Sequence, residues 1–60
     1  MIFEQLFDPK SSTYTYIISS GEGREALVID PVIENTDEYI KVLESLELKL
    51  VKVIDTHIHA

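Results

Sequence analysis

The two histidines of this sequence, His57 and His59, are the residues whose type and spacing could most directly do chemistry. They are separated by a single residue in the stretch IDTHIHA, behind a run of aliphatic side chains. In extended backbone, residues i and i+2 point to the same side with their Cα atoms about 6.6 Å apart. Two such imidazoles can bind one metal ion through a ring nitrogen each. The spacing therefore predicts metal ligands, and the alternative is two ordinary polar residues.

The elements that must position these histidines are a strand, a helix and a second strand. The stretches EALVID and LKLVKVID read as strands, and the second is so continuously aliphatic that it is expected to be buried on both faces. A helix between two strands predicts that the strands are parallel, and ligands of such sheets lie beyond the carboxyl ends of the strands. Asp30 and both histidines fall at those ends. Asp55, just before them, either fixes a histidine tautomer or caps the strand.

The helix is predicted within residues 34–47, the stretch ENTDEYIKVLESLE. Its apolar face is expected to contain Tyr39, Ile40, Leu43 and Leu46. Asn35 followed by Glu38 resembles a capping box, which would satisfy free amide groups at the helix start. No glycine stands at the helix end, so either Glu47 adopts, at some cost, the left-handed conformation that often closes a helix, or the helix ends in a different way.

An antiparallel hairpin is expected before the helix. Residues 2–7 read as a short strand that ends at the Asp8-Pro9 turn, and TYTYIIS leads through two glycines into EALVID. Tyr14 and Tyr16 alternate on one face of this hairpin. They either pack against neighbouring side chains or line a substrate channel, and packing is the more frequent role of such pairs.

Composition limits the class of protein. The chain has 60 residues, of which 45% are hydrophobic and 27% charged, and it has no cysteine. A chain this short buries only about 60% of the surface that it exposes when unfolded, so it is expected to be part of a larger domain. The net charge of −6 has the wrong sign for binding nucleic acid, and no apolar stretch is long enough to span a membrane. We expect a soluble, cytoplasmic protein.

The motifs resemble a known superfamily. DTHIHA resembles the opening of the Thr-His-x-His-x-Asp-His signature of the metallo-β-lactamase superfamily. The stretches IFEQLFDPKSSTYTYII, ALVIDPVIE and LKLVKVIDTHIHA resemble the amino-terminal portion of persulfide dioxygenases, also called sulfur dioxygenases, over all 60 residues. The resemblance implies an α/β (α+β) fold in which residues 1–60 form an incomplete amino-terminal portion of one αββα sandwich domain.

The resemblance also implies an iron site. Persulfide dioxygenases hold one non-haem Fe(II) with two histidines and one aspartate, a ligand set that leaves three adjacent positions free. His57 matches the first iron ligand. His59 matches a residue beside the metal that is a zinc ligand in the related hydrolases. Asp30 either orients a metal-binding histidine, as its place in the family suggests, or satisfies backbone donors at the turn before Pro31.

The function implied for the full-length parent is oxidation of glutathione persulfide to sulfite and glutathione. The remaining ligands would lie after residue 60, so the 60-residue chain alone is expected to bind iron poorly and to be inactive. One alternative is a dizinc thioester hydrolase of the glyoxalase II kind, which is similar at the Asp-Pro and His-x-His segments. The other is a non-catalytic module whose uncovered sheet edges pair with another copy or with the rest of the domain.

Overall fold

The strands and the helix occur in the order expected from the sequence. A computed structural model describes residues 1–21 and 23–56. The elements are β1 (Ile2–Asp8), β2 (Thr13–Ser19), β3 (Glu25–Ile29), a short 3₁₀ turn (Ile33–Asn35), α1 (Thr36–Ser45) and β4 (Lys49–Ile54). Within the described ranges, no helix has the length and apolar character needed to cross a bilayer.

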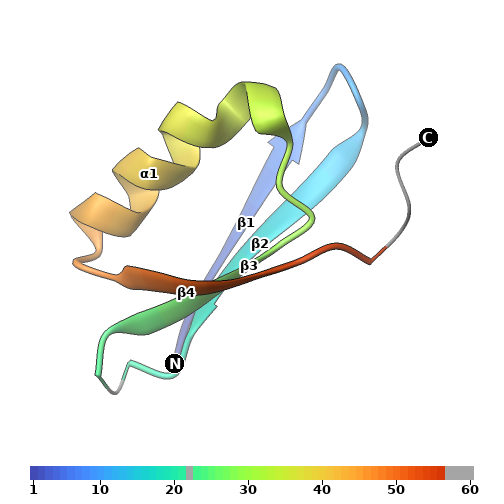
Figure 1. The fold of residues 1–60 in the computed structure, drawn as a ribbon. Coiled ribbons are helices and arrows are strands. Elements are labelled where there is room, and N and C mark those ends of the chain that lie inside the picture. Colours follow the sequence, from blue (N-terminus) through green and yellow to red (C-terminus); the bar gives the residue numbers. More distant parts are fainter. Residues whose placement is uncertain (22, 57–60) are drawn as a thin grey trace.

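The strands form one sheet in the order β1-β2-β3-β4 (Figure 1). β1 pairs with β2 and β2 pairs with β3 in antiparallel register, whereas β3 and β4 are parallel. Both the predicted hairpin and the predicted parallel pair are therefore confirmed. Because β3 and β4 are parallel, their carboxyl ends lie side by side at the same end of the sheet.

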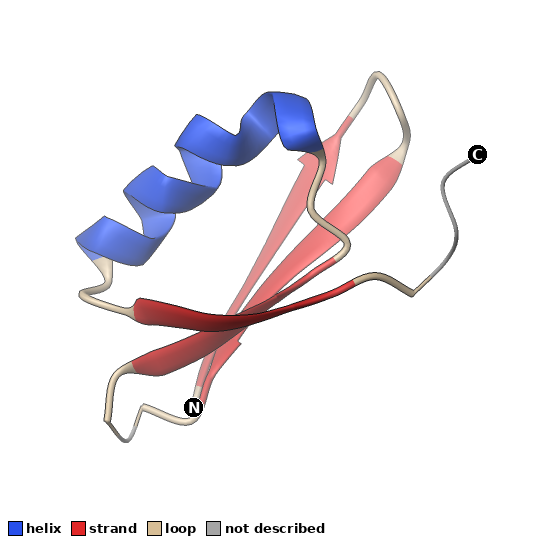
Figure 2. Cartoon of the chain, viewed as in Figure 1, coloured by secondary structure: helices blue, strands red, loops and turns tan. Residues whose placement is uncertain are grey.

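The core lies between the sheet and α1, which lies across one face of it (Figure 2). Alternate residues of β2 point toward the helix, so Thr15, Ile17 and Ser19 are buried while Tyr14 is half exposed. The buried apolar cluster consists of Ile17, Ala26, Val28 and Leu43, with Leu6, Val42 and Leu48 packed against it. Burying a side chain such as Ile17 stabilises the fold by roughly 1.5–3 kcal/mol.

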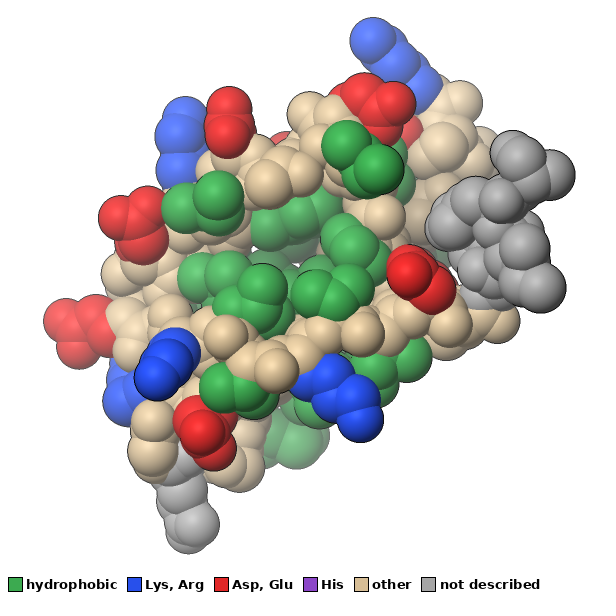
Figure 3. Space-filling view, in the orientation of Figure 1, with side chains coloured by type: hydrophobic (Ala, Val, Ile, Leu, Met, Phe, Trp, Pro, Cys, Tyr) green, Lys and Arg blue, Asp and Glu red, His purple; other side chains and the backbone are tan. Residues whose placement is uncertain are grey.

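The prediction that the last strand is buried on both faces is wrong for the described chain. Val51 and Val53 of β4 are 52% and 50% exposed. β4 is an edge strand, and α1 lies mainly over the neighbouring strands. Hydrophobic side chains are consequently visible in the space between α1 and β4 (Figure 3).

The predicted capping box is also wrong. Asn35 makes no capping hydrogen bond with its side chain, because the 3₁₀ turn places its backbone at φ −104° and ψ 14° instead of the extended conformation of a typical N-cap. Its Nδ2 donates instead to Asp8 Oδ1 at 3.1 Å. The apolar face of α1 differs too: Ile40 is 46% exposed, and Val42 packs against the core in its place.

The end of α1 follows the first of the two alternatives, with Glu47 in the left-handed conformation. Glu47 has φ 55°, and its amide donates to the Glu44 carbonyl oxygen at 3.0 Å. The Leu48 amide donates to the Leu43 carbonyl oxygen at 2.8 Å, which completes a Schellman motif with glutamate at the left-handed position. Arg24, which directly precedes β3, donates from its guanidinium to the carbonyl oxygens of Leu46 and Glu47. Its side chain therefore also caps the end of α1.

Candidate functional site

The carboxyl ends of β3 and β4 bring Asp30 and Thr56 together. Asp30 follows β3 directly, and Asp55 and Thr56 follow β4. The amide of Asp30 donates to the carbonyl oxygen of Ile54 at 2.8 Å, which continues the parallel pairing beyond the last residue of β3. Asp30 therefore lies beside the segment that leads to His57.

The carboxylate of Asp30 binds Thr56 through both oxygens. The Thr56 amide donates to Oδ1 at 2.7 Å, and the Thr56 hydroxyl donates to Oδ2 at 2.5 Å. Hydrogen bonds to an ionised carboxylate are stronger than those between neutral groups. Two such bonds fix the backbone and the side chain of Thr56 at once, one residue before His57 in the sequence.

The backbone of Asp30 is left-handed, with φ 56°. Aspartate tolerates this conformation better than most residues, but it still costs on the order of 1 kcal/mol. Hydrogen bonds on both sides of the residue hold it there: its amide binds Ile54, and its carbonyl oxygen accepts from the Thr15 hydroxyl at 2.6 Å. Strained residues that are held by several hydrogen bonds occur often at functional sites, and the polar groups of Asp30 are tied both to β2 and to the end of β4.

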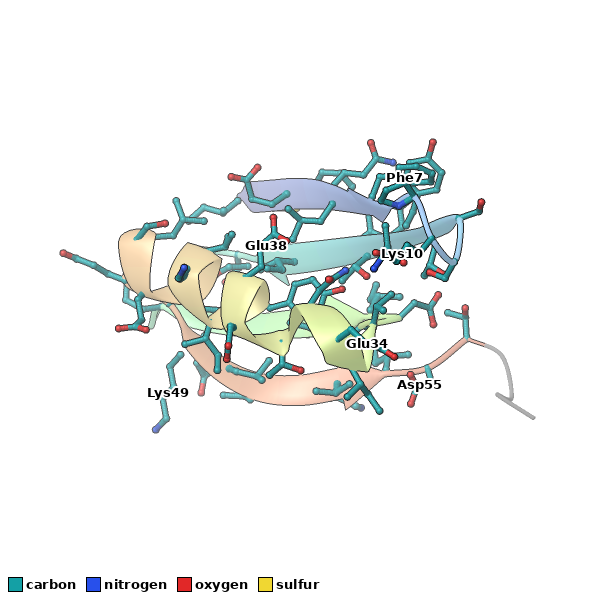
Figure 4. The ribbon with its side chains drawn as sticks, turned by 90° about the horizontal axis from the view of Figure 1, so that it is seen from above. Phe7, Lys10, Glu34, Glu38, Lys49 and Asp55 are labelled. Carbon is teal, nitrogen blue, oxygen red and sulfur yellow. The ribbon has the colours of Figure 1, made fainter. Side chains whose placement is uncertain are left out.

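A pocket of about 660 Å³ opens next to this edge of the sheet. Its walls are the β1–β2 turn, represented by Ser11 and Thr13, the loop 31–34, and Asp55. Glu34 and Asp55 lie at this end of the molecule, whereas Lys49 lies at the opposite end (Figure 4). The lining of the pocket therefore includes two carboxylates and the hydroxyl groups of Ser11 and Thr13.

Asp8 ties the β1–β2 turn to the loop in front of α1. Its Oδ2 accepts from the Ser11 amide at 2.9 Å and from the Ser11 hydroxyl at 2.6 Å, while its Oδ1 accepts from Asn35. These hydrogen bonds, those from Ser11 first, lower the pKa of Asp8 below its usual value. The carboxylate thus holds together two of the walls of the pocket.

The predicted metal ligands His57 and His59 lie outside the described residues. Within residues 1–21 and 23–56, no group of three or more histidine, cysteine, aspartate or glutamate side chains is close enough to hold a metal ion. Of the predicted site residues, the structure places Asp30, whose carboxylate accepts from the amide and from the hydroxyl of Thr56. Imidazole and carboxylate groups, the donor types that the sequence predicts for this site, fit iron or zinc by their chemistry.

Two buried hydroxyl groups support Asp30 and were not predicted. The sequence predicts a strand at Thr15 and the apolar face of the helix at Tyr39, and in the structure their hydroxyl oxygens lie 3.1 Å apart. The signal for Thr15 is its position two residues before the buried Ile17 on the same face of β2. Tyr16, by contrast, accepts a hydrogen bond from Gln5 and stacks at 5.5 Å on Phe3, as packing predicts.

Relatives with known names cover the whole chain. The chain is 43% identical to persulfide dioxygenase ETHE1 of Mus musculus and 38% identical to that of Homo sapiens, over 60 residues in each case. It spans about a quarter of these relatives, 24% of their length. No protein-family model matches the sequence.

Solved structures agree with these relatives. The crystal structure of ETHE1 from Myxococcus xanthus matches all of this chain with a TM-score of 0.96 and 52% identity, and the match covers 27% of that protein. A metallo-β-lactamase from Staphylococcus aureus matches 98% of the chain with a TM-score of 0.88 and 34% identity, over 17% of its own length. The predicted resemblance and the predicted fold class are confirmed: the chain is homologous to part of the persulfide dioxygenases and has the corresponding part of a metallo-β-lactamase fold.

Proposed function

We propose that this chain, a homologue of part of the persulfide dioxygenases, contributes to the iron centre of a longer enzyme that oxidises glutathione persulfide to sulfite and glutathione. The observation that carries the proposal is the similarity to persulfide dioxygenases along the entire chain, up to and including the histidine motif. The uncovered apolar residues of β4 support a longer parent, because exposed valines at a sheet edge are usually covered in a complete domain.

Of the two histidines, His57 is the proposed Fe(II) ligand, and His59 is proposed to lie beside the metal without binding iron. An aspartate and a further histidine would come from the parent. Iron held in this way supplies adjacent open positions for a sulfur substrate and for dioxygen. Asp30 is proposed to position the ligands indirectly. Its carboxylate holds Thr56, the residue before His57, and so orients the chain where the histidine motif begins.

The remaining residues of the edge have supporting roles. Asp55 and Glu34 give the pocket a negative charge, which favours a cation over the anionic substrate in its immediate surroundings. The cytoplasmic location expected from the composition stays a prediction.

The test is oxygen consumption by the full-length parent. The protein is purified with iron, its metal content is measured, and oxygen uptake is followed with glutathione persulfide as substrate. Iron-dependent uptake with formation of sulfite is the expected result. Folded, iron-loaded protein that consumes no oxygen would reject the proposal. Zinc content with hydrolysis of S-lactoylglutathione would instead support the glyoxalase II alternative.

The two histidines provide a matched pair of variants. His57→Ala is expected to lower iron content and oxygen uptake together. His59→Ala is expected to retain most of the iron, because the corresponding residue is not usually an iron ligand in the dioxygenases. Equal loss of metal in both variants would favour a hydrolase-type site, in which both imidazoles bind zinc.

A further inference from the structure

Thr15 and Tyr39 form a buried pair of hydroxyl groups between β2 and α1. Thr15 is 1% exposed and Tyr39 is 6% exposed, and their hydroxyl oxygens lie 3.1 Å apart. A hydroxyl buried this deeply needs hydrogen-bond partners, because water cannot reach it. The partners of this pair are therefore a reliable guide to its role.

Both remaining partners flank Pro31. The Thr15 hydroxyl donates to the carbonyl oxygen of Asp30 at 2.6 Å, and the Val32 amide donates to the Tyr39 hydroxyl oxygen at 2.9 Å. The pair therefore binds the residue before the proline and the residue after it. Proline has no amide hydrogen, so Pro31 itself cannot contribute a donor to hold this turn.

Proton counting fixes the direction of the chain of bonds. Thr15 has one hydroxyl hydrogen, and the Asp30 carbonyl oxygen can only accept, so this hydrogen is used there. The bond between the two hydroxyl groups must then use the hydrogen of Tyr39. The donors run from the Val32 amide to Tyr39, from Tyr39 to Thr15, and from Thr15 to Asp30, so both hydroxyl hydrogens are used.

This relay acts on the segment that precedes the histidines. Its last acceptor is the backbone of Asp30, whose left-handed conformation directs the carboxylate toward Thr56. Loss of either hydroxyl would release one side of the turn while leaving the apolar core in place, since Ile17 and Leu43 supply that packing. The relay thus couples the helix to the end of β4 through Asp30.

We propose that Thr15 and Tyr39 are positioning residues for the metal centre. They fix the Asp30 turn, Asp30 fixes Thr56, and Thr56 precedes the proposed ligand His57. The inference rests on the proposed function for its metal, but it concerns residues that are not among the proposed ligands. It assigns the helix a role in metal binding beyond covering the sheet.

The experiment measures metal affinity in the full-length parent. Tyr39→Phe removes only the phenolic oxygen, and Thr15→Val keeps the branched shape of the side chain. Affinity for Fe(II), and for Co(II) as a spectroscopic probe, is measured by chelator competition on folded protein. Each variant is expected to bind about tenfold more weakly, with a shifted visible spectrum of Co(II). Thr15→Ser, which keeps the hydroxyl, is expected to restore both the affinity and the spectrum.

Ser19 provides the matched control. It lies on the same face of β2, is 2% exposed, and uses its hydroxyl for hydrogen bonds to Glu25 and Gly21 at the other end of the strand. Ser19→Ala is expected to lower stability and to leave the metal affinity and the Co(II) spectrum unchanged. Variants of Thr15 and Tyr39 that bind metal as tightly as Ser19→Ala would overturn the inference.

Two further outcomes are distinguishable. A wild-type parent that binds no iron rejects the proposed function. In that case amide hydrogen exchange of the wild type tests whether the hydrogen bonds of Thr15 and Tyr39 are coupled to Thr56. Exchange also decides the case in which the variants do not fold. Coupling predicts that the amides of Val32 and Thr56 open together with equal protection, and independent opening of the two amides would overturn the inference.

Discussion

Asp30 and Thr56 lie 26 residues apart in the sequence and are joined by two hydrogen bonds, one from the amide of Thr56 and one from its hydroxyl. The bonds link the turn after β3 to the segment after β4. A single side chain therefore connects the carboxyl ends of the two parallel strands, directly before the histidine motif. Asp30 therefore affects stability in two ways, through the hydrogen bonds of its carboxylate and through its left-handed backbone, and substitutions can separate the two.

Three substitutions at position 30 separate these parts. Asp30→Ala loses the carboxylate and keeps an unfavourable left-handed backbone, whereas Asp30→Gly loses the carboxylate alone. We expect the alanine variant to be less stable than the glycine variant by about 1 kcal/mol. Asp30→Asn should be the mildest, because its amide oxygen can still accept from Thr56 and asparagine tolerates the left-handed region. Urea unfolding followed by circular dichroism measures the order, and equal stability of the alanine and glycine variants would contradict it.

The sequence was sufficient to predict the strands, the helix and their order. Alternation in TYTYIIS and the aliphatic run LKLVKVID are local signals that reflect burial on a sheet. For Glu47 the sequence left two alternatives, and the left-handed one is observed because the chain leaves α1 and enters β4 within a few residues. These features depend on neighbours close in sequence.

The features that were wrong or missed depend on partners far away in the sequence. Asn35 matched a capping pattern, but Asp8 lies 27 residues away and competes for its side chain. Nothing near Thr15 in the sequence reveals that Tyr39 and Asp30 will be its partners. The burial of β4 was overestimated because an aliphatic strand indicates burial in a complete domain, and the described chain leaves the strand at the sheet edge.

The lowered pKa of Asp8 predicts a loss of stability in acid. Its folded pKa lies below the usual value of 3.8, chiefly because of hydrogen bonds from Ser11 and then from Asn35. The contribution of this carboxylate is therefore complete above about pH 4 and is lost as the pH falls through the lower folded pKa. Unfolding free energies of wild type and Asp8→Asn, measured between about pH 2 and pH 6, should converge at the acid end.

The relative size of the two hydrogen-bond contributions to the pKa of Asp8 provides a control for that prediction. Ser11→Ala should raise the pKa of Asp8 more than Asn35→Ala, because the Ser11 side chain makes the larger contribution. Carbon-13 chemical shifts of the Asp8 carboxyl group would measure both values. A larger rise in the Asn35 variant would contradict the assignment.

Glu47 is a site where a glycine should stabilise the fold. A glutamate at φ 55° is strained, and glycine adopts this conformation without a steric cost. Glu47→Gly should therefore raise the free energy of unfolding by about 1 kcal/mol. Glu44→Gly is the matched control, since Glu44 is exposed inside α1, where glycine should cost about 1 kcal/mol. Thermal unfolding of the two variants should shift in opposite directions, and a common direction would contradict the role of the left-handed backbone.

Phe7 tests whether the sheet face opposite α1 is covered in the proposed parent. It stacks at 4.8 Å on Tyr14, its cross-strand partner, and it is 51% exposed in this chain. Phe7→Ala should cost about 1 kcal/mol in the 60-residue chain and about 3 kcal/mol in a parent whose second sheet packs on this face. Ile17→Val is the control, because Ile17 is 0% exposed already and should cost about 1 kcal/mol in both proteins. Chemical denaturation of the four variants measures these differences, and an equal cost of Phe7→Ala in chain and parent would show that no second layer covers the face.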